Sequence, residues 1–499
     1  MEKKRERQEM IGRMKGIVTK KNIIQLVIVI LIASVLFSNI AINYRSFDTY
    51  RIETTQGLEN YAMENSFNDG RIFMGLISMA AAKINIDVQV LVTLNIILAI
   101  VILGCCTIYL KNIIVKFTKK ENMDIVFLTL SFLFFFNFMM IDSMQFLENI
   151  VISMSILLYT ISAKKLVLDQ KKSVSLFLGI LGMFFYQATI CCFLQLVLFF
   201  ELVTNKKIKN ILYSIGISLI AIASNYVYIK IYESFFNYKL IRISSDIFSN
   251  IANIFKSCND LIIRSAGFLY DYVWILFILV VLLLIILYNL KKSQNHKNII
   301  SIMSIFLYST IIPISTMIVS KLDYYGSGRI FFSVGSVIPI ILIYILVTTD
   351  IYKEKILKYI FLTITITYFI INAINIYQIC YSFKRVNEFD KQVCDQIIHS
   401  IEKYEKENNK TVTGMAIMYS HNKEWDIFNQ KIRPVAIPRS FILCGLPIRT
   451  ITKLYYNREF DNVFYEEEDY KKYFDEKELE KDFSEKNVEC VNDIAYVYI

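Results

Sequence analysis

The chain has 499 residues and a formal net charge of +10. Its residues are 55% hydrophobic with a mean hydropathy of +0.46, above the apolar share of roughly 45–50% that soluble domains show. Only 5 Pro and 15 Gly occur, which argues against a loop-rich β protein. The positive charge does not indicate a nucleic-acid partner, because the Lys clusters sit beside long apolar blocks, where they set membrane topology.

The first apolar block, about residues 23–42, is long enough to cross a bilayer. The segment before it, residues 1–22, is basic and is expected to stay in the cytoplasm. No small-residue cleavage site follows the block, so we interpret it as a retained first helix and not as a signal peptide.

Residues 23–379 are predicted to form an all-α, polytopic membrane domain of about eleven transmembrane helices. Each predicted span is an apolar run between charged or turn-forming residues. The runs are 23–42, 88–110, 124–141, 149–163, 173–187, 189–204, 211–230, 272–290, 299–320, 330–348 and 358–379. Within the first outer loop, 43–87, the apolar stretch 70–83 is short for a span and predicts an interfacial or re-entrant helix.

The apolar block 173–204 has Lys residues at both ends. One tilted helix would put these ends on opposite faces of the membrane, against the preference for basic residues in the cytoplasm. We therefore predict a hairpin of two short helices that turns near Tyr186–Gln187, with the single tilted helix as the alternative. Every predicted cytoplasmic loop then holds at least three Lys, whereas the outer loop 142–148 holds no Lys or Arg.

The composition changes after residue 379, where the chain becomes more charged and less apolar. The odd number of spans places residues 380–499 on the extracytoplasmic side. Their length suits one small α+β domain. Residues 412–419 and 496–499 are predicted to be strands, and residues 465–486 a charged helix and loop.

Acids and arginines collect on the predicted outer side of the membrane. They are Asp48, Arg51, Asp69 and Arg71 in the first outer loop, Asp142 and Glu148 in the next, Tyr186 and Gln187 at the hairpin turn, and Arg329 at the start of a late span. Arginine binds phosphate in bidentate fashion and neutralises a departing charge, and a carboxylate takes the proton of an attacking hydroxyl. This combination suits the transfer of a sugar from a lipid phosphate, and a single displacement would invert the anomeric carbon.

The same residues resemble those of the Gtr type-II O-antigen glucosyltransferases, a family of the GT-C class of membrane glycosyltransferases. The segment Phe47–Arg51 looks like the family's acidic loop ending in Arg, and Asn68–Arg71 is similar to its Gly-Arg at the start of the next helix. Tyr186–Ala188 resembles the family's Tyr-Gln-Ala, and Arg329 stands where the family has an Arg. The likeness covers residues 25–350, with one departure: the family often has two adjacent acids, and here Phe47 precedes Asp48.

The resemblance implies a GT-C-like enzyme that moves a hexose, expected to be glucose, from a polyprenyl-phosphate sugar to a surface glycan outside the bacterial plasma membrane. Asp48 and Asp69 are the candidate catalytic bases, and the choice between them stays open. The candidate substrate-binding residues are Arg51, Arg71, Asp142, Tyr186, Gln187 and Arg329. The family leaves a divalent metal open, while the nine Cys and three His of the chain show no metal-ligand spacing.

The sequence leaves other interpretations open. A transporter or flippase of lipid-linked saccharides would show repeated halves and polar or broken helices on both leaflets, and no repeat is evident. Polysaccharide polymerases and acyltransferases share the hydropathy pattern, but polymerases usually carry a large late outer loop. Structural roles also compete: Asp69 would cap the helix that follows it, and Arg51 and Arg71 would anchor at the interface.

Overall fold

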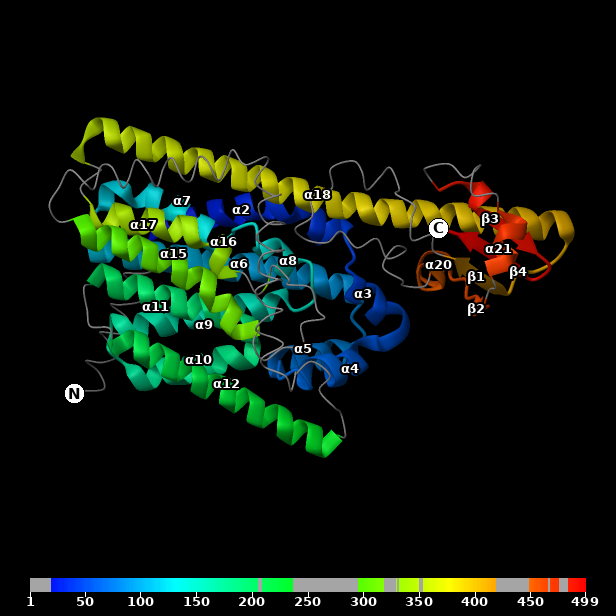
Figure 1. Cartoon of the computed structure of the whole chain (residues 1–499), viewed down its shortest axis with the longest axis horizontal. Coiled ribbons are helices and arrows are strands. Elements are labelled where there is room, and N and C mark those ends of the chain that lie inside the picture. The colour runs from blue at the N-terminus through cyan, green and yellow to red at the C-terminus, as the bar shows by residue number, and fades with distance from the viewer. Residues whose placement is uncertain are drawn as a thin grey trace.

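The computed structural model describes residues 19–204, 209–236, 295–317, 329, 332–349, 353–418, 448–464, 467–474 and 483–499. The described chain is mostly helical and ends in a small sheet. Figure 1 shows the helices gathered in one bundle, with the sheet beyond one of its ends. The predicted span 272–290 lies outside the described residues.

The bundle is built from helices of very different lengths. Its first half comprises α2 (Lys20–Asn43), α3 (Phe47–Arg51), η1 (Ile52–Gln56), α4 (Gly57–Tyr61), η2 (Ala62–Phe67), α5 (Ile72–Lys83), α6 (Val88–Thr118), η3 (Glu121–Met123), α7 (Asp124–Phe135), α8 (Met140–Met144) and α9 (Asn149–Val167). Its second half comprises α10 (Lys172–Phe185), η4 (Gln187–Thr189), α11 (Ile190–Thr204), α12 (Lys209–Phe236), α15 (Asn295–Met317), α16 (Phe332–Gly335), α17 (Val337–Thr348) and α18 (Lys355–Asn408). The segments η1 and η2 are π-helical.

Six helices of the described chain are long and apolar enough to cross a membrane: α2, α6, α9, η4 with α11, α12, and α18. The helices α5, α10 and α17 and part of α15 are shorter but also apolar. The outward faces carry large aliphatic side chains: Leu31 and Val35 of α2 are 61% and 63% exposed, and Leu219 of α12 is 62% exposed. Lipid tails cover such surfaces as well as other side chains do, so these helices are compatible with a multi-pass membrane protein.

The helices α10 and α11 form the predicted hairpin. Tyr186 lies between them with extended backbone angles of φ −159° and ψ 123°. The start of α10 lies beside the start of α12, where the Lys172 Nζ is 3.7 Å from the ring centroid of Tyr213. The helix α12 begins soon after α11 ends. The start of α10 and the end of α11, which are the two ends remote from the turn, therefore lie at the same face of the bundle. The hairpin prediction is confirmed, and the single tilted helix is wrong.

One predicted span is shorter than expected. Instead of continuing over 124–141, α7 ends at Phe135. The Asn137 side chain takes over main-chain hydrogen bonds here, since its Nδ2 donates to the Phe134 carbonyl at 2.9 Å and its Oδ1 accepts from the Met139 N–H at 3.0 Å. Such local side-chain bonds compete with the helical ladder, and the chain turns into α8.

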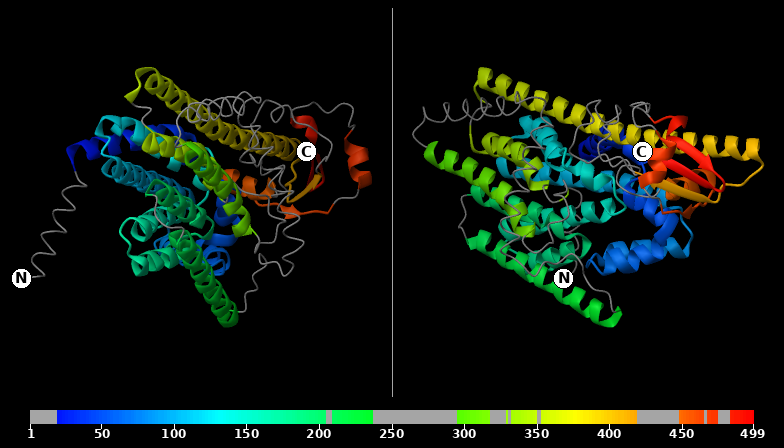
Figure 2. Two further views of the ribbon diagram at one scale, coloured as in Figure 1. Left: turned by 60° about the vertical axis from the view of Figure 1, so that its left-hand side comes forward. Right: turned by 45° about the vertical axis from the view of Figure 1, so that its right-hand side comes forward.

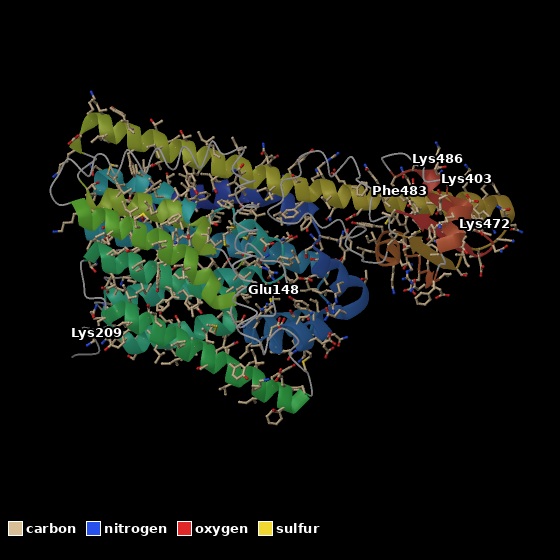
Figure 3. The ribbon with its side chains drawn as sticks, viewed as in Figure 1. Glu148, Lys209, Lys403, Lys472, Phe483 and Lys486 are labelled. Atoms are coloured by element: carbon tan, nitrogen blue, oxygen red, sulfur yellow. The ribbon has the colours of Figure 1, made fainter. Side chains whose placement is uncertain are left out.

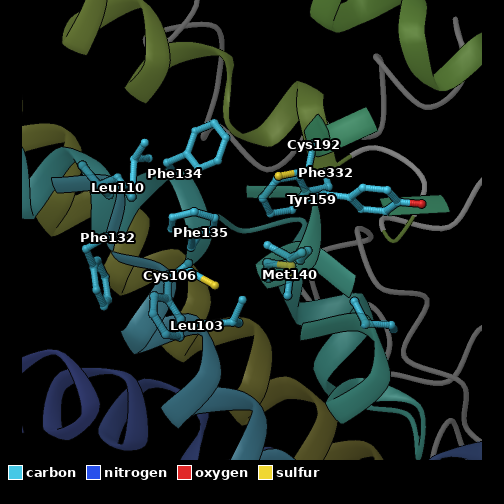
Figure 4. Close-up of a cluster of buried hydrophobic side chains, with 14 of the residues drawn as sticks. Leu103, Cys106, Leu110, Phe132, Phe134, Phe135, Met140, Tyr159, Cys192 and Phe332 are labelled. Carbon is cyan, nitrogen blue, oxygen red and sulfur yellow. The ribbon is translucent and has the colours of Figure 1, made fainter. Parts of the chain in front are cut away.

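The centre of the bundle is an apolar core between α6, α7, α9, α11 and α16. Figure 4 shows side chains from all five helices meeting there. The labelled residues include Leu103, Cys106, Phe134, Phe135, Tyr159, Cys192 and Phe332, each at most 2% exposed. The aromatic run that the sequence places near 132–138 therefore packs mainly inward.

The last long helix connects the bundle to the C-terminal domain. The views of Figures 1 and 2 agree that α18 lies along one side of the bundle and extends beyond it. The predicted domain boundary at residue 380 falls inside α18, which runs unbroken from Lys355 to Asn408. Neither Gly nor Pro occurs in this stretch, and the helix ends at Asn409, whose positive φ of 50° is a common helix stop.

The C-terminal domain is an α+β unit. Its sheet has the order β2-β1-β4-β3, in which β1 (Gly414–Met418) pairs in parallel with β2 (Asp461–Asn462) and β4 (Ile494–Tyr498), and β4 pairs antiparallel with β3 (Val488–Val491). The helices α20 (Ile448–Tyr456) and α21 (Glu467–Tyr473) and the turn η6 (Glu485–Asn487) accompany the sheet. The two predicted strands are confirmed as β1 and β4.

The helix ends sort into two faces. At one end lie the Lys-rich segments, where Lys120 Nζ donates to the carbonyls of Leu346, Val347 and Thr349 at distances of 2.7–3.2 Å. Figure 3 shows Lys209 at this end and Glu148 toward the opposite end, beside α5. The C-terminal domain lies beyond the end that carries Glu148 (Figure 1).

A buried ion pair joins α2, α6 and α7 at the Lys-rich end. Lys111 Nζ lies 3.1 Å from Asp124 Oδ1, and their side chains are only 2% and 8% exposed. Lys111 also donates to Gln25 and Asn22, and Lys21 contacts Asp124 at 3.0 Å. A charge buried among apolar helices needs such partners, because its desolvation is costly.

Removing one member of this pair should destabilise the bundle strongly. Asp124→Ala leaves Lys111 uncompensated and should lower the unfolding free energy by about 3–5 kcal/mol. The double change Lys111→Met with Asp124→Leu should recover most of that loss. The control Asp169→Ala removes a more exposed pair with Lys164 and should cost about 1 kcal/mol or less. Thermal unfolding in detergent measures all three, and equal losses for Asp124→Ala and Asp169→Ala would show that the buried pair contributes no more than the exposed one.

Candidate functional site

The first site segment is a tight turn between η2 and α5. The Arg71 N–H donates to the Ser66 carbonyl at 2.8 Å, which closes the turn. Gly70 has a φ of +74°, and a Cβ there would lie 2.6 Å from the Asn225 side chain. Asn225 of α12 in turn donates to the Gly70 carbonyl at 2.9 Å. Only Gly satisfies both the left-handed backbone and the close approach, so the turn presents Asp69 and Arg71 in one fixed arrangement.

Arg71 is the centre of the site. Its Nη1 lies 2.7 Å from Glu148 Oε1, and its Nη2 lies 3.6 Å from Asp69 Oδ2. Its Cζ lies 5.0 Å from the ring centroid of Tyr186, within the range of a cation–π contact. The side chains of Arg71, Asp69 and Glu148 are only 14%, 10% and 4% exposed. Three separate segments of the chain therefore meet at one largely buried guanidinium.

Arg329 forms the second half of the site with Asp142. The Arg329 Nε is 3.7 Å from Asp142 Oδ2, and its backbone N–H donates to the same oxygen at 3.3 Å. The guanidinium lies 4.0 Å from the ring centroid of Phe146. Gln145 holds the other carboxylate oxygen at 2.5 Å and itself accepts from the Tyr44 hydroxyl at 3.2 Å. Asp142 is thus oriented from two sides.

The hairpin turn of α10 and α11 reaches into the site. Gln187 Nε2 donates to the backbone carbonyl of Asp69 at 2.7 Å. The Tyr186 carbonyl accepts from Ser155 Oγ at 3.2 Å and from Thr189 Oγ1 at 2.8 Å. Polar groups at such a depth need partners, and here they hold the turn against the first outer loop.

The charges of the two halves act on one another. Burial alone would raise the pKa of Glu148, but the nearby guanidinium groups of Arg71 and Arg329 lower it below its usual value. Burial opposes the charge on both arginines, yet the surrounding acids and the Tyr186 hydroxyl raise the pKa of each guanidinium above its ordinary value. Two guanidinium groups and the Glu148 carboxylate are therefore all ionised in a poorly solvated place.

The two remaining predicted residues lie on α3. Asp48 is partly buried on α3, and its charge acts on Tyr61, whose raised pKa is caused first by burial, then by Glu148 and then by Asp48. Arg51, at the end of α3, has an exposed side chain, unlike the buried arginines. The structure therefore brings seven predicted residues together, with Asp48 beside them and Arg51 outside. The seven are Asp69, Arg71, Asp142, Glu148, Tyr186, Gln187 and Arg329.

Two side chains of the site were not predicted from the sequence. Asn225 holds the Gly70 turn, and its polar side chain inside the apolar run of α12 was a usable signal. Tyr61, buried between acidic groups, carried no signal, because an aromatic residue in a loop is common.

The arginines keep hydrogen-bonding capacity. Within the described residues, Arg71 Nε and Arg329 Nε have no hydrogen-bond partner. Buried donors without acceptors are rare in proteins and need an explanation, such as a bound ion or a catalytic role. No group of three or more His, Cys, Asp or Glu in the described part of the chain is arranged to hold a metal ion.

Comparisons with known proteins give no relative. No family model, no curated protein and no solved structure matches this chain.

Proposed function

We propose that the chain is a membrane glycosyltransferase of the GT-C type that moves a hexose, with glucose as the first candidate, from a polyprenyl-phosphate sugar to a surface glycan. The observation that carries the proposal is the pair of partly buried, ion-paired arginines, Arg71 and Arg329, at one end of the apolar helices. A donor of this class has an apolar tail that dissolves in lipid and a phosphate at the membrane boundary. The apolar tail matches the apolar helices near these arginines, and the phosphate matches their guanidinium groups.

The arginines would stabilise the departing lipid phosphate. As the glycosidic bond breaks, negative charge grows on the phosphate oxygen, and a nearby guanidinium stabilises that charge more in a poorly solvated site than in water. Among the described residues, Arg71 Nε has no hydrogen-bond partner and retains donor capacity for such an oxygen. Glu148, ionised and bonded to Arg71 at 2.7 Å, would hold that side chain in place.

The base would come from Asp48 or Asp69. Asp69 Oδ2 lies 3.6 Å from Arg71 Nη2, beside the guanidinium that would hold the phosphate. Asp48 lies on α3, where an acceptor hydroxyl would arrive from outside the bundle. Either carboxylate would take the acceptor proton as that oxygen attacks the anomeric carbon. One displacement of this kind inverts the anomeric configuration.

The orientation follows the distribution of charge. The Lys-rich helix ends would face the cytoplasm of a bacterial cell, in accordance with the positive-inside rule. The arginine site and the C-terminal domain, which lie toward the opposite end (Figures 1 and 3), would then face outward, where a surface glycan is available as acceptor.

A transporter of lipid-linked saccharides is the second candidate. One observation favours it: the buried Lys111–Asp124 pair lies at the Lys-rich end, so charged side chains are buried near both ends of the bundle. A transporter uses polar groups on both leaflets. The enzyme is preferred because the arginines, acids and hairpin turn converge at one end only.

Substitution of the candidate bases tests the enzyme directly. With purified protein and a panel of polyprenyl-phosphate sugars, wild type should release free lipid phosphate when a glycan acceptor is present. Asp69→Asn and Asp48→Asn remove the two candidate bases while keeping side-chain size. The variant that lacks the true base should lose roughly 100-fold or more of the rate, the contribution typical of a general base.

The matched control is Glu59→Gln, an exposed acid in the same outer loop, which should transfer sugar at the wild-type rate. Wild-type rates in both aspartate variants would remove these acids from the mechanism. Movement of an intact saccharide lipid across proteoliposomes, without release of lipid phosphate, would favour the transporter instead.

The orientation has its own test. A reporter that is active only outside the cytoplasm, fused after Ile499, should be active, and the same reporter fused after Lys120 should be inactive. The reason is that the basic end stays on the cytoplasmic side. The reverse pattern would refute the proposed orientation.

A further inference from the structure

The first outer loop is fastened to the C-terminal domain through one tyrosine. Tyr50 of α3 is fully buried and belongs to the hydrophobic core of that domain, together with Phe389, Val393 and Ile448. Its hydroxyl lies 2.7 Å from the hydroxyl of Tyr455, on α20. The two rings meet edge to face, with centroids 6.3 Å apart. Tyr50 is therefore part of both units.

Polar contacts fix the chain just before Tyr50. The backbone N–H of Arg45 donates to Asn387 Oδ1 at 2.6 Å, and Asn387 Nδ2 donates back to the Arg45 carbonyl at 3.3 Å. The Arg45 guanidinium pairs with Glu53 at 3.1 Å and lies 5.9 Å from the ring centroid of Tyr455. The long helix α18 and the helix α20 thus hold both ends of α3.

The segment held in this way carries Asp48. The helix α3 has only five residues, Phe47–Arg51, and helices shorter than about 12 residues are marginal without tertiary contacts. Its N-cap, Ser46, accepts from the Thr49 N–H at 3.2 Å. The placement of Asp48 therefore depends on the anchors at Asn387 and Tyr455 more than on α3 itself.

The first outer loop leads from this anchor to the arginine site. Tyr455 contacts Tyr50, and Tyr50 lies two residues after Asp48. Further along the loop, Thr54 Oγ1 donates to the Tyr50 carbonyl at 2.7 Å, and Gln56 bonds with Glu64 at 3.0 Å and with Asn65 at 3.2 Å. The Arg71 N–H then donates to the Ser66 carbonyl at 2.8 Å. The C-terminal domain is thus connected to the site without touching Arg71.

We propose that the Tyr50–Tyr455 contact positions Asp48 against the arginine site, so that the C-terminal domain sets the geometry of the transfer step. Tyr50 and Tyr455 are positioning residues and do not touch the substrate. This inference rests on the proposed glycosyltransferase activity. It assigns the C-terminal domain a part in the reaction that composition alone does not suggest.

The test compares kinetic parameters in the full-length protein. Tyr455→Phe keeps the ring and removes the hydrogen bond. It should lower kcat for sugar transfer by roughly ten- to a hundredfold, since small misplacements of a reacting group cost that much. The KM for the lipid donor should stay unchanged, because the arginines that hold the phosphate are not moved. Tyr50→Phe should show the same split.

The double variant Tyr50→Phe with Tyr455→Phe should be no slower than the slower single variant, because both changes remove one contact. The matched control is Tyr470→Phe, in the same domain. It removes a buried hydroxyl that donates to the Ala416 and Val497 carbonyls, away from the outer loop. It should leave kcat and KM at wild-type values.

Hydrogen exchange gives a readout that does not depend on activity. In Tyr455→Phe, amides of residues 46–61 should exchange faster than in wild type, and in Tyr470→Phe they should not. Wild-type kcat in Tyr455→Phe, with an active wild-type enzyme, would overturn this inference and leave the proposed function standing. A wild-type protein that cleaves no lipid-linked sugar would overturn the function, and this inference with it.

Discussion

The structure depends on the ion pairs that neutralise two partly buried arginines. A guanidinium taken out of water loses several kcal/mol of solvation, which only close carboxylates recover. Arg71 finds Glu148 and Asp69, and Arg329 finds Asp142. These partners come from loops that are far apart in sequence. The cost of a lone charge therefore ties three segments to one another, and the apolar bundle can hold them only at its ends.

Other parts of the fold hold these charged side chains in place. Side chains from five helices pack together in the core of Figure 4, and the Gly70 turn against Asn225 fixes the backbone next to Arg71. The hairpin turn adds Gln187, which holds the backbone of Asp69. The helix α18 leads into the C-terminal domain, and the hydrophobic core of that domain includes Tyr50 of the first outer loop. The site thus sits between a rigid bundle and a folded domain, and both contact the loop that holds the candidate bases.

Much of this arrangement was predictable from sequence. Hydropathy and Lys placement predicted the hairpin at Tyr186, since only a hairpin keeps both basic ends together. The same alternation of basic loops predicted Asp69, Arg71, Asp142 and Arg329 at one end of the bundle. The residue patterns near 412–419 and 496–499 were also sufficient to predict the strands β1 and β4.

Other features could not be predicted from sequence. The end of α7 depends on the Asn137 side chain, which replaces backbone hydrogen bonds. The spacing of apolar residues does not predict such a bond. The unbroken path of α18 through residue 380 was hidden by a change from apolar to charged composition, which looks like a domain boundary. The pairing of each arginine with a given acid, and the burial of Tyr50 in the distant domain, depend on tertiary contacts alone.

Direct binding of a lipid phosphate tests the central claim. A short-chain polyprenyl phosphate without sugar should bind the purified protein saturably. The double change Arg71→Gln with Glu148→Gln, which removes the guanidinium together with its nearest carboxylate, should raise the Kd by roughly ten- to a hundredfold, as expected for the loss of one charged hydrogen-bonding partner. Arg385→Gln, at an exposed arginine of α18, should leave the Kd unchanged. Equal Kd values for wild type and both variants would contradict a lipid-phosphate site at Arg71.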